Sequence, residues 1–141
     1  MNIVNNRVKI TVILLIIIEF FNGLSALAGG VGILSDLTGK TLGMDTSMLQ
    51  GSPFKNFLIP GIILFTFHGV GNTFAAIYSI KQGKYMNEVA MFFGIGMMIW
   101  IIVQVAIIGY GSILQALYFS TGLIQLILGF IIKRTYNTSG A

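Results

Sequence analysis

Four long apolar stretches dominate the chain, and their length constrains what it can fold into. They run from about residue 8 to 34, 58 to 80, 88 to 109 and 112 to 132. Each reaches the roughly 20 residues that a helix needs to cross a bilayer core of about 30 Å. None shows the alternation of a barrel strand, and a backbone in lipid must satisfy its own hydrogen bonds, so we expect helices. The predicted fold is an all-α integral membrane four-helix bundle, with residues 1–141 forming a single domain.

Composition supports a membrane protein and excludes several other classes. The chain is 55% hydrophobic and only 9% charged, with a mean hydropathy of +0.90, which is too apolar for a soluble domain. It has no cysteine, so it cannot be a disulfide oxidoreductase, an iron–sulfur protein or a thiolate zinc site. Its basic residues stand singly between apolar runs, which favours a lipid bilayer over nucleic acid as the partner.

The basic residues also predict an orientation. A loop at 35–57, a short link at 81–87 and a turn at 109–111 connect the spans, and the last two force antiparallel hairpins. Lys40 and Lys55 lie in the loop 35–57. The opposite side carries six basic residues: Arg7, Lys9, Lys81, Lys84, Lys133 and Arg134. By the positive-inside rule, both termini and the tail 133–141 are expected in the cytoplasm.

Several polar side chains fall within the apolar stretches, where they usually face the bundle interior. With about 1.5 Å of rise per residue from the basic anchors, Glu19, Asn72 and Gln125 lie about 12–15 Å into the bilayer. The same arithmetic places Asn22 and His68 at about 20 Å, and Gln104 and Gln115 at about 24–27 Å. The resulting column, which is expected to line a proton or solute path, consists of Glu19, Asn22, His68, Asn72, Gln104, Gln115 and Gln125.

Helical spacing places small and polar residues on one face of each span, which predicts close helix packing around the column. These stripes are Glu19, Asn22, Gly23, Ala26 and Gly30 in the first span; His68, Gly71, Asn72, Ala75 and Ser79 in the second; Ala90, Gly94, Met97, Ile101 and Gln104 in the third; and Gln115, Tyr118, Gly122, Gln125 and Gly129 in the fourth.

Glu19 and His68 are the ionisable members of the column. A carboxylate at this depth must be protonated, paired or reached by water. Glu19 therefore either exchanges protons or, as a neutral acid, bonds to Asn72 or Gln125 and locks the packing. His68 relays a proton to Glu19, makes a structural hydrogen bond or serves as an axial haem ligand. Because a single histidine completes neither a haem nor a zinc site, no cofactor or metal is expected.

Trp100 lies near the middle of the third span rather than at a bilayer surface. Two interpretations remain open for its ring: packing in the core, or contact with a quinone or lipid. No Ser–His–Asp arrangement is evident, because the only histidine lies deep in the second span. We therefore do not expect an enzyme.

Motifs in the second span and beyond carry a resemblance to known proteins. They are Ser52-Pro53-Phe54, Phe57-Leu58-Ile59-Pro60-Gly61, His68-Gly69-Val70-Gly71-Asn72, Trp100, Val103-Gln104, Gly109, Ser112, Leu114-Gln115 and Tyr118-Phe119. With these residues the chain resembles an uncharacterised family of small bacterial four-span integral membrane proteins. The resemblance covers nearly the whole chain and implies a location in the bacterial plasma membrane, but no particular activity.

The chain is also similar to the small multidrug resistance transporters, which have four short spans and one membrane-embedded glutamate in the first. Glu19 matches that glutamate. The long loop 35–57 and the strong charge bias depart from that pattern, so drug export does not carry over.

Three functions remain open. The leading hypothesis is a small proton-linked transport or permeation unit in which Glu19 binds a proton, His68 relays it and the amides line the path. Because four helices enclose little space, such a unit is expected to form a homodimer. The alternative is a non-catalytic accessory or scaffold subunit of a larger membrane complex. The third is a quinone- or haem-associated membrane protein that uses His68 and Trp100.

Overall fold

The protein is described by a computed structural model, which covers residues 3–139 and the side chains of residues 6–138. Three long helices are continuous: α1 (Ile3–Ser35), α4 (Met86–Ile108) and α5 (Ile113–Ser139). A fourth combines α2 (Leu58–Ile63), the π-helical stretch η3 (Leu64–Val70) and α3 (Gly71–Ile80). Two short 3₁₀ helices, η1 (Lys40–Leu42) and η2 (Thr46–Leu49), lie in the loop after α1. Residues 3–139 contain no strand, which confirms the all-α prediction.

Four helices are long and apolar enough to cross a membrane: Asn6–Ser35, Leu58–Ile80, Met86–Ile108 and Ile113–Thr138. The second has the bounds that hydropathy predicts. The fourth continues well beyond residue 132, into the segment that hydropathy assigns to a tail. Hydropathy marks where the apolar part of a helix ends, whereas residues such as Lys133 and Arg134 are compatible with further helical turns.

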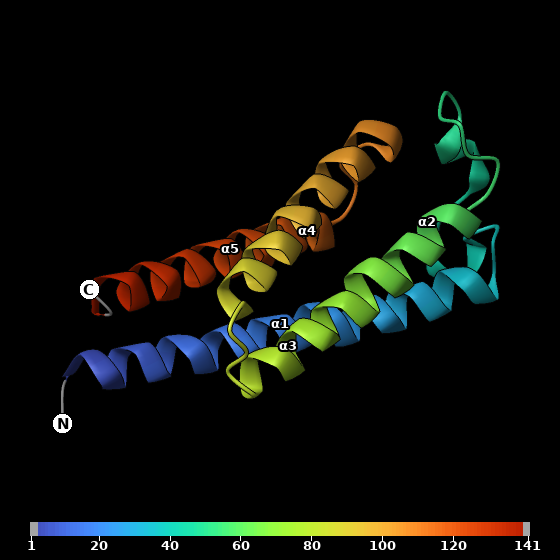
Figure 1. The fold of residues 1–141 in the computed structure, drawn as a ribbon. Helices are drawn as coiled ribbons and strands as arrows, with labels where there is room; N and C mark the ends of the chain where they lie inside the picture. The colour runs from blue at the N-terminus through green and yellow to red at the C-terminus, as the bar shows by residue number, and fades with distance from the viewer. Residues whose placement is uncertain (1–2, 140–141) are drawn as a thin grey trace.

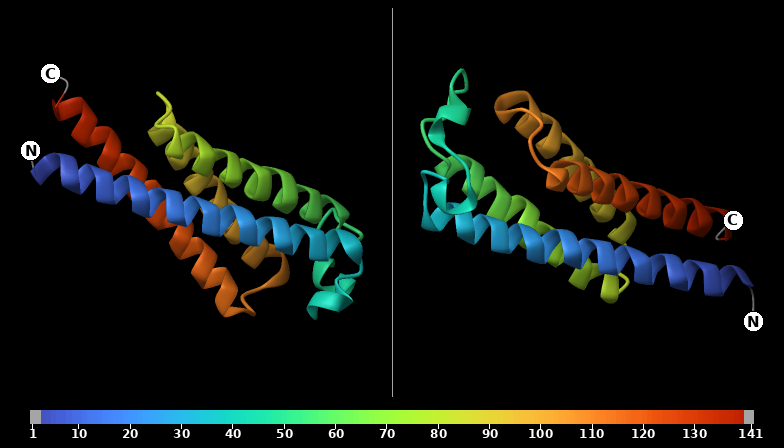
Figure 2. Two further views of the ribbon diagram at one scale, coloured as in Figure 1. Left: turned by 90° about the horizontal axis from the view of Figure 1, so that it is seen from below. Right: turned by 180° about the vertical axis from the view of Figure 1, so that it is seen from behind.

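The helices pack as two antiparallel hairpins. α1 lies along the helix formed by α2, η3 and α3, and α4 lies along α5, while α5 also contacts α1 (Figure 1). Both termini and the α3–α4 link lie toward one end of the bundle, here named the terminus end (Figures 1 and 2). The loop after α1 and the α4–α5 turn lie toward the other, the loop end.

Glycines allow the helix backbones to come close. A Cβ atom at Gly23 of α1 would lie 2.6 Å from the backbone nitrogen of Thr73 in α3. Gly94 of α4 and Gly122 of α5 face each other, and a Cβ atom on either would lie 2.8–2.9 Å from the carbonyl oxygen of the other. Real Cβ contacts are never this short, so any larger residue would force these helices apart.

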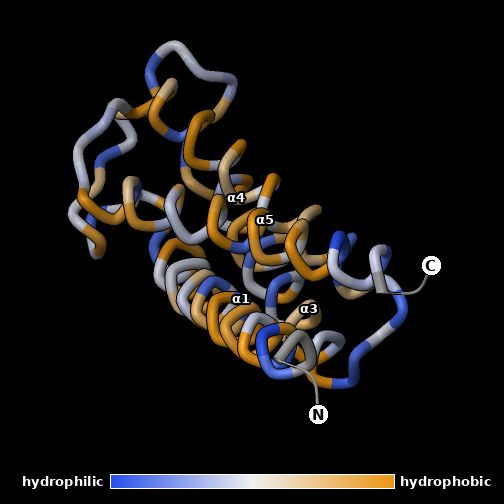
Figure 3. The backbone as a smooth tube through the Cα atoms, turned by 90° about the vertical axis from the view of Figure 1, so that its left-hand side faces the viewer, coloured by the Kyte–Doolittle hydropathy of each residue, from blue (hydrophilic) through white to orange (hydrophobic). Residues whose placement is uncertain are grey.

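The outer surface of the bundle is apolar. Only 17–33% of the most apolar window of each long helix is buried inside the molecule, so these windows need an apolar medium around them. Ile17, Phe74, Ile102 and Phe130 show that every long helix contributes exposed apolar side chains. Much of the hydrophilic chain lies in the loops and near the helix ends (Figure 3).

The loop after α1 is held by one carboxylate. Asp36 accepts hydrogen bonds from the backbone nitrogen and hydroxyl of Thr38 at 3.1 and 2.6 Å. It also accepts from the same groups of Thr41 at 2.9 and 2.7 Å. These hydrogen bonds favour the ionised form and hold the pKa of Asp36 well below its usual range. Asp36 thus fixes the chain as it leaves α1.

Candidate functional site

A closed network of buried polar side chains, here named the amide layer, crosses the middle of the bundle. It consists of Asn22, Asn72, Thr121 and Gln125. Asn22 Nδ2 donates to Gln125 Oε1 at 2.8 Å, and Thr121 Oγ1 donates to Asn22 Oδ1 at 2.7 Å. Gln125 Nε2 donates to Asn72 Oδ1 at 3.0 Å and to the Ala90 carbonyl oxygen at 3.1 Å. Asn72 Nδ2 donates to the His68 carbonyl oxygen at 3.0 Å.

The amide layer therefore links all four long helices, since Ala90 belongs to α4. The glycine contacts explain why it can close: Gly23 brings α1 against α3 beside Asn72, and Gly94 brings α4 against α5 beside Gln125. Asn22, Asn72 and Gln125 are fully buried. Amides that satisfy one another in this way stabilise the bundle and leave no open passage in this layer.

Glu19 lies one helical turn from the amide layer, toward the terminus end, and is equally buried. Neither carboxyl oxygen has a hydrogen-bond partner, and neither does the Ser79 hydroxyl, which faces the carboxyl group from α3. Side chains tilt toward the N-terminus of their helix, so Glu19 points away from the amide layer and toward Ser79. These two groups are here named the Glu19–Ser79 pair. Its polar atoms lack hydrogen-bond partners, whereas those of the neighbouring amide layer have them.

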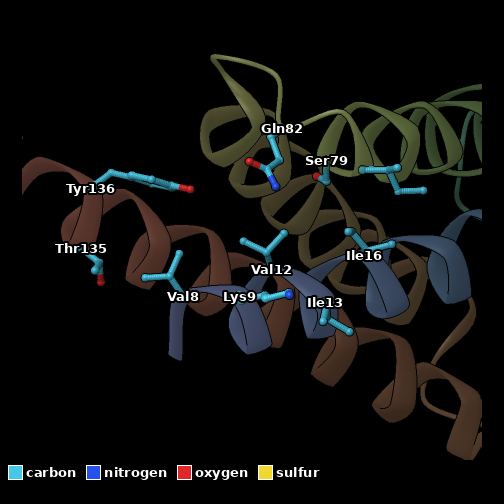
Figure 4. A pocket seen from close by; sticks show the side chains of 10 residues that line it. Val8, Lys9, Val12, Ile13, Ile16, Ser79, Gln82, Thr135 and Tyr136 are labelled. Carbon is cyan, nitrogen blue, oxygen red and sulfur yellow. The ribbon is translucent and has the colours of Figure 1, made fainter. Parts of the chain in front are cut away.

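A pocket of about 390 Å³, here named the terminus-end pocket, reaches this pair from the terminus end. Ser79 lines it, whereas Glu19 does not, and the Ser79 hydroxyl faces the carboxyl group of Glu19. Figure 4 shows Lys9 and Val12 of α1, Ser79 of α3, Gln82 of the α3–α4 link and Tyr136 of α5 around the space. The lining residues are Val8, Lys9, Val12, Ile13, Ile16, Ser79, Ile80, Gln82, Thr135 and Tyr136.

His68 lies on the loop-end side of the amide layer, within η3. It is buried, and its Nδ1 atom has no hydrogen-bond partner. Its ring lies 4.9 Å from that of Phe67 and 5.4 Å from that of Trp100, between ring centroids. Because the chain directions of α1 and the η3–α3 segment are opposite, His68 and Glu19 tilt away from each other. The amide layer separates them, and no hydrogen bond joins them.

Two predicted column residues lie apart from this centre. Gln115 lies in the first turn of α5 and bonds back to the α4–α5 turn: Oε1 accepts from the Gly111 nitrogen at 2.9 Å, and Nε2 donates to the Gly109 carbonyl oxygen at 3.1 Å. Gln104 is half-buried on α4 near the loop end. Trp100 is also half-buried. Among the described residues, no three His, Cys, Asp or Glu side chains gather into a possible metal site.

The predicted depths group Glu19 with Asn72 and Gln125, whereas in the structure Asn22 takes that place. Depth estimates assume that every helix starts at the same height, but Gly23 meets α3 beside Asn72 and so brings Asn22 level with it. The two hydrogen bonds considered for Glu19, to Asn72 or to Gln125, are not formed. The predicted path also omits Thr121 and Ser79, although Thr121 stands four residues before Gln125 and Ser79 seven after Asn72, on the same helix faces.

Comparison of the chain with protein-family models, curated proteins and solved structures finds no match. The function therefore has to be inferred from the geometry of the Glu19–Ser79 pair, the amide layer and the terminus-end pocket.

Proposed function

We propose that the protein is a multi-pass protein of the bacterial plasma membrane with both termini in the cytoplasm. The four long apolar helices and their exposed apolar surface support the membrane location. The orientation rests on charge, since the terminus end carries six Lys and Arg residues and the loop after α1 only Lys40 and Lys55. In this orientation the terminus-end pocket opens toward the cytoplasm.

Its activity, we propose further, is small-scale proton-linked transport in which Glu19 binds and releases the coupling proton. The observation that carries this proposal is a fully buried carboxyl group with both oxygens unpartnered, set behind the wall of a pocket. A carboxyl group with no protein partner at this depth needs a proton or water. The pocket brings cytoplasmic water to Ser79, and the Ser79 hydroxyl passes a proton to Glu19.

The amide layer is the barrier of this mechanism. It closes the path between Glu19 and His68. In this proposal the two groups therefore exchange protons with opposite sides of the membrane, and no proton passes directly from one to the other. Transport then requires a second state in which the amide hydrogen bonds break or exchange partners. We propose that a homodimer supplies the space for this rearrangement, because four helices alone enclose little volume.

The test compares Glu19→Gln with Glu88→Gln in proteoliposomes that contain a pH-sensitive dye. Glu88 is exposed at the terminus end, 3.3 Å from Lys133, so it controls for the loss of one carboxylate there. A panel of organic anions, cations and neutral solutes is applied in turn. We expect at least one solute to change the internal pH, Glu19→Gln to fold normally and lose the change, and Glu88→Gln to keep it.

Infrared spectroscopy tests the same proposal without a known solute. The carboxyl stretch that disappears in Glu19→Gln should titrate reversibly with cytoplasmic pH. A Glu19 carboxyl group that never titrates, or solute-driven pH changes that survive in Glu19→Gln, would show that Glu19 does not carry the coupling proton.

The closed amide layer favours a second candidate, an accessory or scaffold subunit whose polar side chains only fix the helix packing. This function predicts that Glu19→Gln has no effect on any flux. It also predicts that purification from native membranes recovers a partner protein in a fixed ratio.

A further inference from the structure

The terminus-end pocket has a positive charge that no carboxylate compensates. Lys9 lines it and has no ion-pair partner among the described residues, where the single ion pair joins Lys133 to Glu88. The same end of the molecule carries four more basic side chains: Arg7, Lys81, Lys84 and Arg134. The potential at the mouth of the pocket therefore attracts anions.

Half of the residues that line the pocket are aliphatic, which limits the kind of anion that fits. Five aliphatic side chains line it: Val8, Val12, Ile13, Ile16 and Ile80. A volume of about 390 Å³ matches the lower range of small-molecule sites. A strongly hydrated inorganic anion would lose its water against these walls, whereas an anion with a short hydrocarbon body would bury that body.

Ser79 supplies a polar group at the deep end. Its hydroxyl is fully buried, lines the pocket and has no hydrogen-bond partner. A hydroxyl group donates one hydrogen bond and accepts others, so Ser79 can donate to a bound carboxylate while it accepts from protonated Glu19. An ionised Glu19 would repel that carboxylate. Anion binding and protonation of Glu19 therefore favour each other, by the reciprocity of linked binding.

The titratable side chains that line the pocket or pack beside it are Lys9 on α1, Tyr78 on α3 and Tyr136 on α5, and Glu19 forms no hydrogen bond with any of them. Glu88 on α4 and Lys133 on α5 are exposed and pair with each other.

From these observations we infer that the terminus-end pocket binds a monocarboxylate with a short hydrocarbon body, its carboxylate lying between Lys9 and Ser79. The inference rests on the proposed function, since the proton on Glu19 is the one that moves with the anion. One unpaired cation matches one negative charge. A carboxylate that moves together with one proton transfers no net charge across the membrane.

The experiment measures ligand binding to the purified full-length protein by calorimetry. Sodium butyrate is the probe, and butyramide and butylammonium chloride have the same carbon chain without the negative charge. We expect butyrate to bind, more tightly as the pH falls, and the other two not to bind. Lys9→Gln should weaken butyrate binding about 10-fold or more, because it removes a hydrogen bond to a charged group. Lys84→Gln, at the same end but outside the pocket lining, removes the same charge without the contact and should weaken binding much less than Lys9→Gln does.

Two arms distinguish the sources of the carboxylate. Butyrate added to protein in detergent represents a free acid from the cytoplasm, and oleate incorporated into nanodiscs represents a fatty acid of the membrane. Binding of either that depends on Lys9 supports the inference. The absence of binding in both arms overturns it, and so does an equal loss of binding in Lys9→Gln and Lys84→Gln, which would indicate only a general charge effect.

Glu19→Gln separates this inference from the proposed function. The variant imitates the protonated acid, so it should bind butyrate with an affinity that no longer depends on pH. If Glu19 titrates and drives flux but butyrate does not bind, the ligand class is wrong and the proton-linked function stands. If butyrate binds through Lys9 but Glu19 never titrates, the coupling proton is wrong and the anion site stands.

Discussion

The amide layer and the Glu19–Ser79 pair lie one helical turn apart and are buried to the same extent, yet they differ in their hydrogen bonds. Asn22, Asn72 and Gln125 bond to one another across three helices. Glu19 and Ser79 leave all three of their side-chain oxygens unpartnered. The same stripe of small residues supports both groups, so close packing alone does not satisfy a polar side chain.

This difference identifies the buried groups that need water, a proton or a ligand to satisfy their hydrogen bonds. An unsatisfied buried polar group costs about 1–3 kcal/mol, and more if it is charged. The amide layer avoids this cost by itself, whereas the Glu19–Ser79 pair avoids it only with water, a proton or a ligand. The terminus-end pocket reaches Ser79, the member of this pair that lines it, and that contact gives the functional proposal its physical basis.

The largest difference between the two groups is expected in their access to water. The chain has no cysteine, so Ser79→Cys and Thr121→Cys each introduce a single thiol in place of a hydroxyl. Ser79 lines the pocket, whereas Thr121 belongs to the amide layer. In proteoliposomes we expect a water-soluble maleimide to label Ser79→Cys from the side of the terminus end at a rate close to that of a Lys84→Cys control. Thr121→Cys should stay unlabelled from both sides. Equal labelling of the two cysteines would show that water reaches both groups or neither, which contradicts the expected difference.

The next largest effect is expected on stability. Gln125→Met keeps the length of the side chain but removes the bonds to Asn22 Nδ2, Asn72 Oδ1 and the Ala90 carbonyl oxygen. Because buried amide groups lose their partners, we expect the free energy of unfolding to fall by about 2 kcal/mol. Unfolding by SDS in mixed micelles measures this change.

Gln104→Met is the matched control, since Gln104 is half-buried and makes no hydrogen bond to a described residue. We expect it to change the stability little, and Glu19→Gln likewise. If Gln125→Met were as stable as Gln104→Met, the amide layer would contribute nothing to the packing of the helices, and its role as the barrier would lose its support.

Much of the fold is predictable from the sequence because hydropathy and helical spacing are local properties. The bounds of the helix Leu58–Ile80 follow from its apolar run, and the predicted faces containing Asn22, Gly23 and Asn72 are the ones that pack. Spacing also identifies Ala90, Gly94 and Met97 as one buried stripe. These features depend on residues only a few positions apart.

The hydrogen bonds of the site depend on relations between helices, which spacing does not contain. The relative height of α1 and α3, set where Gly23 meets Thr73, decides that Asn22 rather than Glu19 reaches Gln125. The direction of each side chain decides that Glu19 and His68 diverge. Gln115 has the spacing of a column residue, but its amide group bonds instead to the backbone of the preceding turn, at Gly109 and Gly111. Depth therefore identifies polar residues that could belong to the site, and only the packing of the helices decides which of them bond to one another.

The smallest effect concerns a second carboxylate, that of Asp36, which lies in the loop after α1 and has its hydrogen bonds satisfied. Asp36 accepts four hydrogen bonds from Thr38 and Thr41, whereas Glu19 accepts none. Since the folded loop lowers the pKa of Asp36, its contribution to stability is fully present above the ordinary carboxyl pKa of about 4. The contribution disappears as the pH falls through the lowered value.

We therefore expect Asp36→Asn to speed hydrogen exchange at the amides of Thr38 and Thr41 at neutral pH, because the amide nitrogen of asparagine cannot accept a hydrogen bond. Asp45→Asn is the control, since Asp45 accepts from the Ser47 nitrogen at 2.8 Å and asparagine caps a helix equally well. Exchange by mass spectrometry on peptides covering 36–49 measures both. Unchanged exchange at 38–41 in Asp36→Asn would show that the loop is held by packing around Phe57 and Leu49 rather than by its carboxylate. The accelerated exchange that we expect would instead establish that the Asp36 carboxylate holds the loop through its four donors, in contrast to Glu19, which has none.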